Sequence, residues 1–131
     1  MTNSVTLAFE KVEQTLKALD VALKAPMQPD RLNIDAAIQR FEFSVELFWK
    51  LLKRILADQG VEVAYPKQTL KEAYAGKLIN NEDIWISMLN DRNITSHTYD
   101  MELADQIFSR LKEYYPVMQL TLLSLKAQSS V

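Results

Sequence analysis

The chain contains no cysteine and only one histidine, and both shortages exclude classes of site. Without cysteine there are no disulfides and no metal ions held by thiolates. Any metal site would have to be rich in carboxylates, and a di-iron bundle would need paired Glu-x-x-His motifs that a single histidine cannot supply. We therefore expect neither a metal ion nor an organic cofactor.

Long apolar runs are missing as well. No stretch approaches the roughly 18 consecutive apolar residues that a membrane-spanning helix needs, and no apolar run that could act as a signal peptide follows the polar start at residues 1–4. We predict a cytoplasmic protein with no membrane association.

The length of 131 residues predicts one domain, residues 1–131. The net charge of −2 argues against a general basic surface for nucleic acid, although a small basic cleft is compatible with it.

Glycine and proline are scarce, with two and four residues, and they separate segments of helical periodicity. Apolar residues recur at spacings of three and four over residues 5–23 and again over residues 34–55, which is typical of one helical face. We predict a first helix with Ser4 as its N-cap. We predict a second helix over about residues 30–59, ended by Gly60.

Capping signals divide the rest of the chain. Thr69 and Glu72 fit a capping box that opens a short helix, which we expect to end near Gly76. Asn80 or Asn81 can cap the helix that follows. We expect this helix to end in the polar segment 91–97.

A last helix can begin after Asp100 and remains in apolar register to about residue 125. Pro116 interrupts it, and we expect a kink or a new helix there because proline lacks a backbone donor. No useful strand alternation appears. The fold class that we predict is all-α, an antiparallel up-and-down bundle of four to five helices.

The chain lacks the motifs of a nucleotide-binding enzyme. There is no glycine-rich phosphate loop, since Gly60 precedes Val61 and Gly76 precedes Lys77. A minimal nucleotidyltransferase would need a Gly-Ser turn followed by paired aspartates. No Gly-Ser dipeptide occurs, so the chain is not that enzyme.

The segment from Arg92 to His97 holds residue types that suit phosphate chemistry. Arginine offers a permanent charge in a fork that matches phosphate, and histidine can take or give a proton near neutral pH. On an unbroken helix the two residues would lie about 140° apart. A helix ending near Asn93 would let them converge on one cleft, and Thr95 and Ser96 favour such a turn. The alternative is a surface histidine and an arginine placed favourably at a helix C-terminus.

The second predicted helix carries a polar flank beside its apolar stripe. Its members, at spacings of four, three and four, are Glu42, Glu46, Trp49 and Lys53. One interpretation is a solvated flank in which Glu46 and Lys50 form a weak surface pair. Arg92, however, continues an apolar stripe on its own helix, and an inward arginine needs an anionic partner. Our hypothesis is that Glu42 or Glu46 faces Arg92 and positions it.

Two motifs together resemble a known family. The pattern Arg92-Asn93-x3-His97-x-Tyr99 resembles the Arg-x4-His-x-Tyr motif of the HEPN superfamily. The segment from Arg40 to Lys53 is similar to the second-helix signature of its nucleotidyltransferase substrate-binding branch. The resemblance covers nearly the whole chain, to about residue 125.

The resemblance implies a bundle of four or five helices, commonly a homodimer, that forms a complex with a minimal nucleotidyltransferase. In many such pairs the HEPN member is a toxin and the nucleotidyltransferase its antitoxin. HEPN ribonucleases cut RNA without metal, with the 2′-hydroxyl as the attacking group. The resemblance therefore implies a metal-independent endoribonuclease.

The implied roles can be assigned residue by residue. Arg92 would stabilise phosphate charge, His97 would transfer protons and Asn93 would orient the site. Two protomers would bring these motifs into one cleft. Tyr99 would be adenylylated by the partner, which would silence the toxin; without the family it is a half-buried aromatic residue at a helix start. The supporting residues on the second helix are Glu42, Glu46, Trp49, Lys50 and Lys53.

Two other functions remain open. A non-catalytic subunit that presents a substrate to the nucleotidyltransferase fits the acidic composition and the lack of a basic stripe. A structural dimerisation module would use both motifs for packing alone. The intact motif favours the ribonuclease.

Overall fold

The computed structural model describes residues 3–98 and 100–129, and within them the chain forms five α-helices and no strand. This confirms the predicted all-α class. The helices are α1 (Asn3–Lys24), α2 (Leu32–Asp58), α3 (Pro66–Ala75), α4 (Glu82–His97) and α5 (Met101–Ser129). None of these helices is long and apolar enough to cross a membrane.

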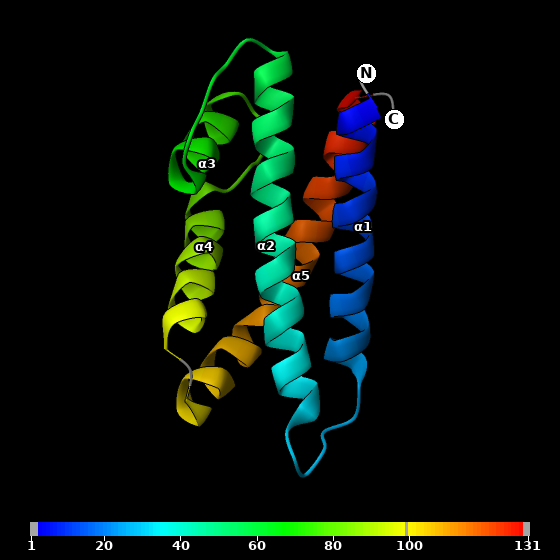
Figure 1. Ribbon diagram of the computed structural model, residues 1–131, viewed down its shortest axis with the longest axis vertical. Helices are drawn as coiled ribbons and strands as arrows, with labels where there is room; N and C mark the ends of the chain where they lie inside the picture. Colours follow the sequence, from blue (N-terminus) through cyan, green and yellow to red (C-terminus); the bar gives the residue numbers. More distant parts are fainter. Residues whose placement is uncertain (1–2, 99, 130–131) are drawn as a thin grey trace.

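Helix α2 is the central element of the bundle and contacts each of the other four helices. Figure 1 shows α1 running antiparallel to α2 on one side, with α3 and α4 on the other side. Helix α5 crosses behind α2 obliquely and then runs beside α1 (Figure 1). The start of α2 is tied to α5 by Arg31, whose Nη2 lies 2.6 Å from Oδ1 of Asp105. The two faces of α2 therefore have different neighbours.

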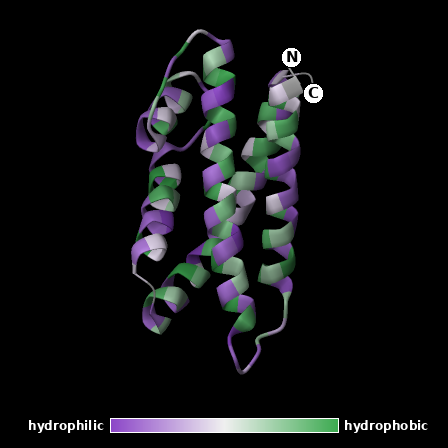
Figure 2. Ribbon diagram, viewed as in Figure 1, coloured by the Kyte–Doolittle hydropathy of each residue, from purple (hydrophilic) through white to green (hydrophobic). Residues whose placement is uncertain are grey.

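One hydrophobic cluster draws buried residues from all five helices. Its largest members include Phe9, Phe48 and Trp85. The rings of Phe48 and Trp85 lie 4.7 Å apart and join α2 to α4, and Phe41 stacks on Tyr114 at 5.6 Å to join α2 to α5. Figure 2 shows both hydrophobic and hydrophilic residues on the helices, as expected of helices with one buried face.

Several predicted helix boundaries are confirmed. Helix α2 ends at Asp58, and Gly60 follows with φ +83°, the left-handed geometry expected of a residue that ends a helix. The side chain of Asn81 accepts a hydrogen bond from the Ile84 amide at the start of α4. Asp100 accepts one from the Leu103 amide at the start of α5.

Two predicted N-caps are wrong. Ser4 lies inside α1. The third helix begins at Pro66, three residues before the predicted cap, because proline at the first helical position already has the required φ. Thr69 is therefore an interior residue, and its hydroxyl donates to the carbonyl of Tyr65 at 2.7 Å.

Pro116 lies inside α5, which runs without interruption from Met101 to Ser129, so no new helix begins there. Of the two predicted outcomes, a new helix is excluded, and a kink within α5 stays a prediction. Buried side chains on both sides of the proline, Tyr114 and Met118, pack in the same core. Tertiary packing supplies most helical stability in a folded protein, and here it maintains one continuous element.

Candidate functional site

The C-terminal half of α4 lies against the middle of α2, and an ion pair joins them. Nη2 of Arg92 lies 2.6 Å from Oε2 of Glu46, with side chains that are 27% and 30% exposed. The pair is therefore partly shielded from water, where a charge-assisted contact is stronger than on an open surface. The structure thus shows the contact that the polar flank predicted, and it is made by Glu46.

The carboxylate of Glu46 gathers two further donors from its own helix. Nε1 of Trp49 donates to it at 3.0 Å, and Nζ of Lys50 lies 3.2 Å from its other oxygen. Partial burial acts to raise the pKa of Glu46, but the hydrogen bonds from Trp49 and Lys50 and the charge of Arg92 outweigh that effect. The pKa of Glu46 therefore lies below its ordinary value, and the carboxylate stays ionised opposite Arg92 at neutral pH.

Glu42 lies one turn earlier on α2 and makes a different contact. It accepts hydrogen bonds from the hydroxyls of Thr95 at 2.8 Å and Ser96 at 3.0 Å. Both hydroxyls also lie within hydrogen-bonding distance of the Arg92 carbonyl oxygen. The structure thus places Glu42 against the last turn of α4 rather than against the arginine.

Helix α4 ends at His97, within the predicted polar segment 91–97, and not near Asn93, where convergence of Arg92 and His97 on one cleft would require it to end. Thr95 and Ser96, which favour turns, bond instead to Glu42 and to the helix backbone, so the last turn is retained. Arg92 and His97 consequently lie about 140° apart around one helix. Within one chain they do not converge on one cleft.

The two ends of the motif have different environments. Arg92 is half-buried and is held on both sides, since Nη1 donates to the side-chain oxygen of Asn93 at 3.0 Å. His97 is exposed at the last residue of α4. Tyr99, the predicted modification site, lies outside the described residues. The motif therefore presents a fixed arginine and an accessible imidazole at one end of a helix.

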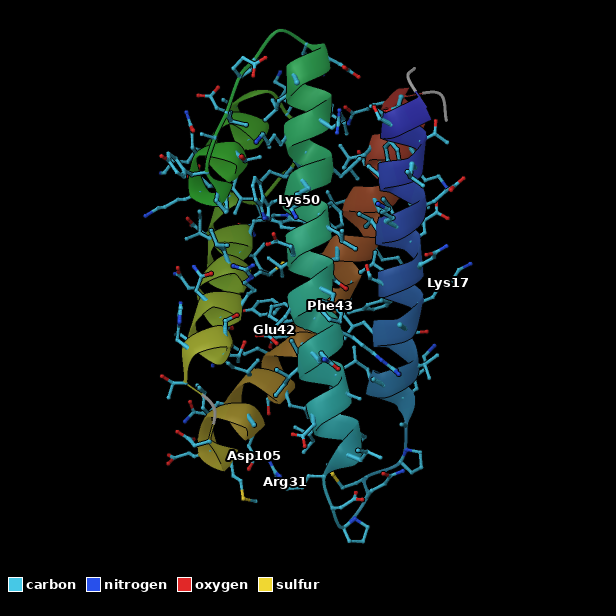
Figure 3. The ribbon with its side chains drawn as sticks, in the orientation of Figure 1. Lys17, Arg31, Glu42, Phe43, Lys50 and Asp105 are labelled. Carbon is cyan, nitrogen blue, oxygen red and sulfur yellow. The ribbon has the colours of Figure 1, made fainter. Side chains whose placement is uncertain are left out.

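Trp49 and Lys53 extend the polar flank toward the end of α2. The ammonium group of Lys53 lies 5.8 Å from the centre of the Trp49 ring, within range of a cation–π contact. A hollow of about 400 Å³ is lined by Trp49, Lys50, Lys53, Arg54 and Ala57. Figure 3 shows Glu42 and Lys50 on α2, which faces α4 along this flank. Trp49, Lys50 and Lys53 thus line one hollow, and Glu46 connects that hollow to Arg92.

A polar cluster that was not predicted from the sequence lies on the other side of α4. Asp91, only 6% exposed, accepts two hydrogen bonds at 2.8 Å from Arg110 and one at 2.6 Å from the hydroxyl of Tyr114. Hydrogen bonding to Asp91 raises the pKa of Arg110, and burial, together with the same carboxylate, raises the pKa of Tyr114. The spacing of Met88, Asp91 and Thr95 could have revealed an inward aspartate.

These polar contacts fix both faces of α4. Asp91 anchors the helix to α5, whereas Arg92 and Thr95 anchor it to α2. Among the described residues no group of three or more histidine or acidic side chains could hold a metal ion. By their residue types, Arg92 can hold an anion and the exposed imidazole of His97 can exchange a proton.

A family model described as nucleotidyltransferase substrate binding protein like matches residues 3–127. The chain belongs to this family. It is 35% identical over 120 residues to a Haemophilus influenzae protein named probable ribonuclease HepT, across 86% of this chain and 82% of that protein. The family expected from the two motifs is thereby confirmed.

Solved structures agree with this assignment. A Thermus thermophilus crystal structure superposes with a TM-score of 0.80 at 35% identity, covering 88% of this chain and 98% of the other. A Haemophilus influenzae structure, described as revealing the fold of a substrate-binding domain of a nucleotidyltransferase, gives 0.70 at 32% identity, covering 95% and 98%. Both likenesses span nearly the whole bundle.

Proposed function

We propose that this protein is a metal-independent endoribonuclease, the HEPN-type toxin of a pair in which a minimal nucleotidyltransferase is the antitoxin. The observation that carries the proposal is the fixed position of Arg92 between Glu46 and Asn93, five residues before an exposed His97. A preorganised arginine suits the charge that develops on a phosphate, because no reorganisation is needed during the reaction. The ribonuclease name of the Haemophilus relative supports the same activity.

The proposed reaction uses the RNA itself as the nucleophile. The 2′-oxygen forms a bond to phosphorus as the bond to the 5′-oxygen breaks. The 2′-hydroxyl proton is removed and a proton is delivered to the leaving 5′-oxygen, with His97 in proton transfer. Arg92 binds the non-bridging oxygens, where negative charge accumulates. The products carry a 2′,3′-cyclic phosphate and a 5′-hydroxyl, and no metal takes part.

A homodimer completes the proposed site. Because α4 is helical through His97, one chain directs Arg92 and His97 to different sides of the helix. We propose that a second copy, related by a two-fold axis, supplies the histidine that complements each arginine. Adenylylation of Tyr99 by the nucleotidyltransferase would then block the cleft with bulk and negative charge.

The alternative is a subunit that presents a substrate to the nucleotidyltransferase without catalysis. The family description and the description of the Haemophilus influenzae structure favour it. In this case Arg92 would bind a substrate phosphate, and His97 would have no role in proton transfer.

Incubation of the purified protein with total cellular RNA, in the presence of a chelator, distinguishes the two proposals. We expect cleavage with 2′,3′-cyclic phosphate ends by the wild type, and none by an Arg92→Ala/His97→Ala variant. If neither protein cuts, while the homodimer and its complex with the nucleotidyltransferase still form, the ribonuclease proposal is wrong and the binding subunit replaces it.

A further inference from the structure

Positive side chains gather on the C-terminal half of α2 and the facing part of α1. Lys50 and Arg54 are exposed on α2, Lys53 is half-buried beside them, and Lys11 is exposed on α1. We call these four residues the basic cluster. Lys50 and Arg54 line two hollows, one of about 400 Å³ beside Trp49 and one of about 210 Å³ shared with Lys11. The cluster thus surrounds concave surface rather than a smooth helix face.

The charge of this cluster is poorly compensated. The whole chain has a net charge of −2, yet in the described residues only Lys50 of the cluster forms an ion pair, with Glu46. Lys50 and Arg54 are four residues apart on one helix, where like charges repel. An anionic ligand would relieve this repulsion, and a local positive field would attract it despite the acidic total.

The cluster is continuous with the Arg92 site. Glu46 contacts Arg92 through one carboxylate oxygen and Lys50 through the other. Arg54 lies two turns beyond Glu46, about 12 Å along α2. A polyanion held at Arg92 would therefore reach Lys50 and Arg54 without turning away from the surface. A single phosphate would not extend so far.

We propose that the basic cluster binds the phosphates of single-stranded RNA that flank the cleaved bond. The inference rests on the proposed function and extends it to the substrate. Single-stranded RNA is the occupant that the surface fits, because the Trp49 ring lines the larger hollow among three cations. Basic grooves that contain an aromatic side chain suit strands whose bases are free to stack.

The experiment uses an RNA oligonucleotide methylated at every 2′-oxygen, which lacks the attacking hydroxyl and is not cleaved. Its affinity is measured in chelator at several salt concentrations. Lys11→Gln/Arg54→Gln is compared with the wild type and with Lys17→Gln/Lys112→Gln, which removes the same charge elsewhere. Figure 3 shows Lys17 on the outer side of α1, away from α2. None of the four substituted side chains forms an ion pair within the described residues, so we expect all the variants to fold.

We expect weaker binding by Lys11→Gln/Arg54→Gln only. Two lost phosphate contacts should make the slope of log K against log salt shallower by about 1.4, while the control keeps the wild-type slope. Equal affinities and slopes for the two double variants would overturn the inference. It would also be overturned if the wild type bound no RNA and the first variant instead weakened the complex with the nucleotidyltransferase, since the cluster would then bind protein.

Failure of this inference differs from failure of the proposed function. The probe reports binding alone, because it cannot be cleaved. Cleavage of ordinary RNA with no effect of Lys11→Gln/Arg54→Gln on binding would reject the cluster and leave the ribonuclease. If that variant loses RNA binding and the wild type binds RNA but never cuts it, the result would support the basic cluster and reject the ribonuclease.

Discussion

Glu46 of α2 and Arg92 of α4 form a half-buried ion pair 2.6 Å long between residues 46 positions apart in the chain. It fixes the orientation of the arginine before any ligand arrives. The same carboxylate is held by Trp49 and Lys50, so its own position is restrained. The family motif on α4 and the polar flank on α2 are therefore one physical unit.

Removing the charge of Glu46 should release Arg92. We expect Glu46→Gln to lower the free energy of unfolding by about 1–2 kcal/mol, since a hydrogen bond to a charged partner is lost or weakened. We also expect a lower kcat for RNA cleavage with little change in KM, because Arg92 would have to be oriented during the reaction. Glu10→Gln, an exposed change on α1, is the control. Unchanged stability and kcat in Glu46→Gln would contradict a positioning role.

The Glu46 contact should depend on pH. Its pKa is lower in the folded protein than the ordinary value of 4.5, so its contribution to stability is complete above that value. It is lost as the pH falls through the folded-state pKa, because the carboxyl then protonates. The stability difference between wild type and Glu46→Gln, measured by urea unfolding, should therefore shrink on acidification. A difference that grew at low pH would show that another group dominates.

The guanidinium of Arg92 should not be replaceable by an ammonium group. Arg92→Lys keeps the charge but loses the fork that reaches Glu46 and Asn93 together. We expect kcat/KM for RNA to fall by a factor of about 10² or more, as when one preorganised donor is removed. Steady-state cleavage of a labelled oligonucleotide measures this. Activity within twofold of wild type would mean that charge alone suffices.

Asp91 should contribute more to stability than any neighbouring exposed residue of α4. Asp91→Ala leaves the buried Tyr114 hydroxyl and Arg110 without their acceptor, and we expect a loss of about 2–3 kcal/mol. Asn90→Ala, exposed on the same helix, should change stability by no more than about 0.5 kcal/mol. Urea unfolding of both variants tests the contrast, and equal values would remove Asp91 as the anchor between α4 and α5.

Glu42 should hold the last turn of α4 in helical form. We expect Glu42→Ala to speed hydrogen exchange at the amides of residues 95–98, because Thr95 and Ser96 would lose their shared acceptor. Gln39→Ala, an exposed change one turn away on α2, is the control. Exchange rates that match the control would show that the helix needs no support from Glu42.

The sequence predicted helices well and their ends less well. Apolar periodicity reflects burial, so the buried face of α2 could be predicted from the sequence. The end of α2 before Gly60 could be predicted as well. The exact position of the end of α4 within its polar segment could not be predicted, because Thr95 and Ser96 favour a turn only when their hydroxyls lack another partner. The sequence cannot show that Glu42 lies within 3.0 Å of both. Only the packed bundle turns these local preferences into a longer helix.

The contacts of the candidate site likewise include some that could be predicted from the sequence and some that could not. An inward arginine and a flank of carboxylates were enough to predict a contact, and the choice of Glu46 over Glu42 depends on the relative position of two helices. Asp91 was missed because it adjoins Arg92 and appeared to belong to a polar segment. Its partners on α5, Arg110 and Tyr114, are 19 and 23 residues away. Such long-range pairs leave little local pattern.

We propose that Arg92 and His97 of different chains act together, because one chain directs these two side chains apart. Arg92→Ala and His97→Ala should each be inactive, and the two variants, co-expressed so that mixed dimers form, test the claim most directly. A mixed dimer retains one Arg92 and one His97 from different chains, so we expect RNA cleavage at least about tenfold above either variant alone. A co-expressed pair as inactive as its parents, beside an active wild type prepared identically, would contradict the account.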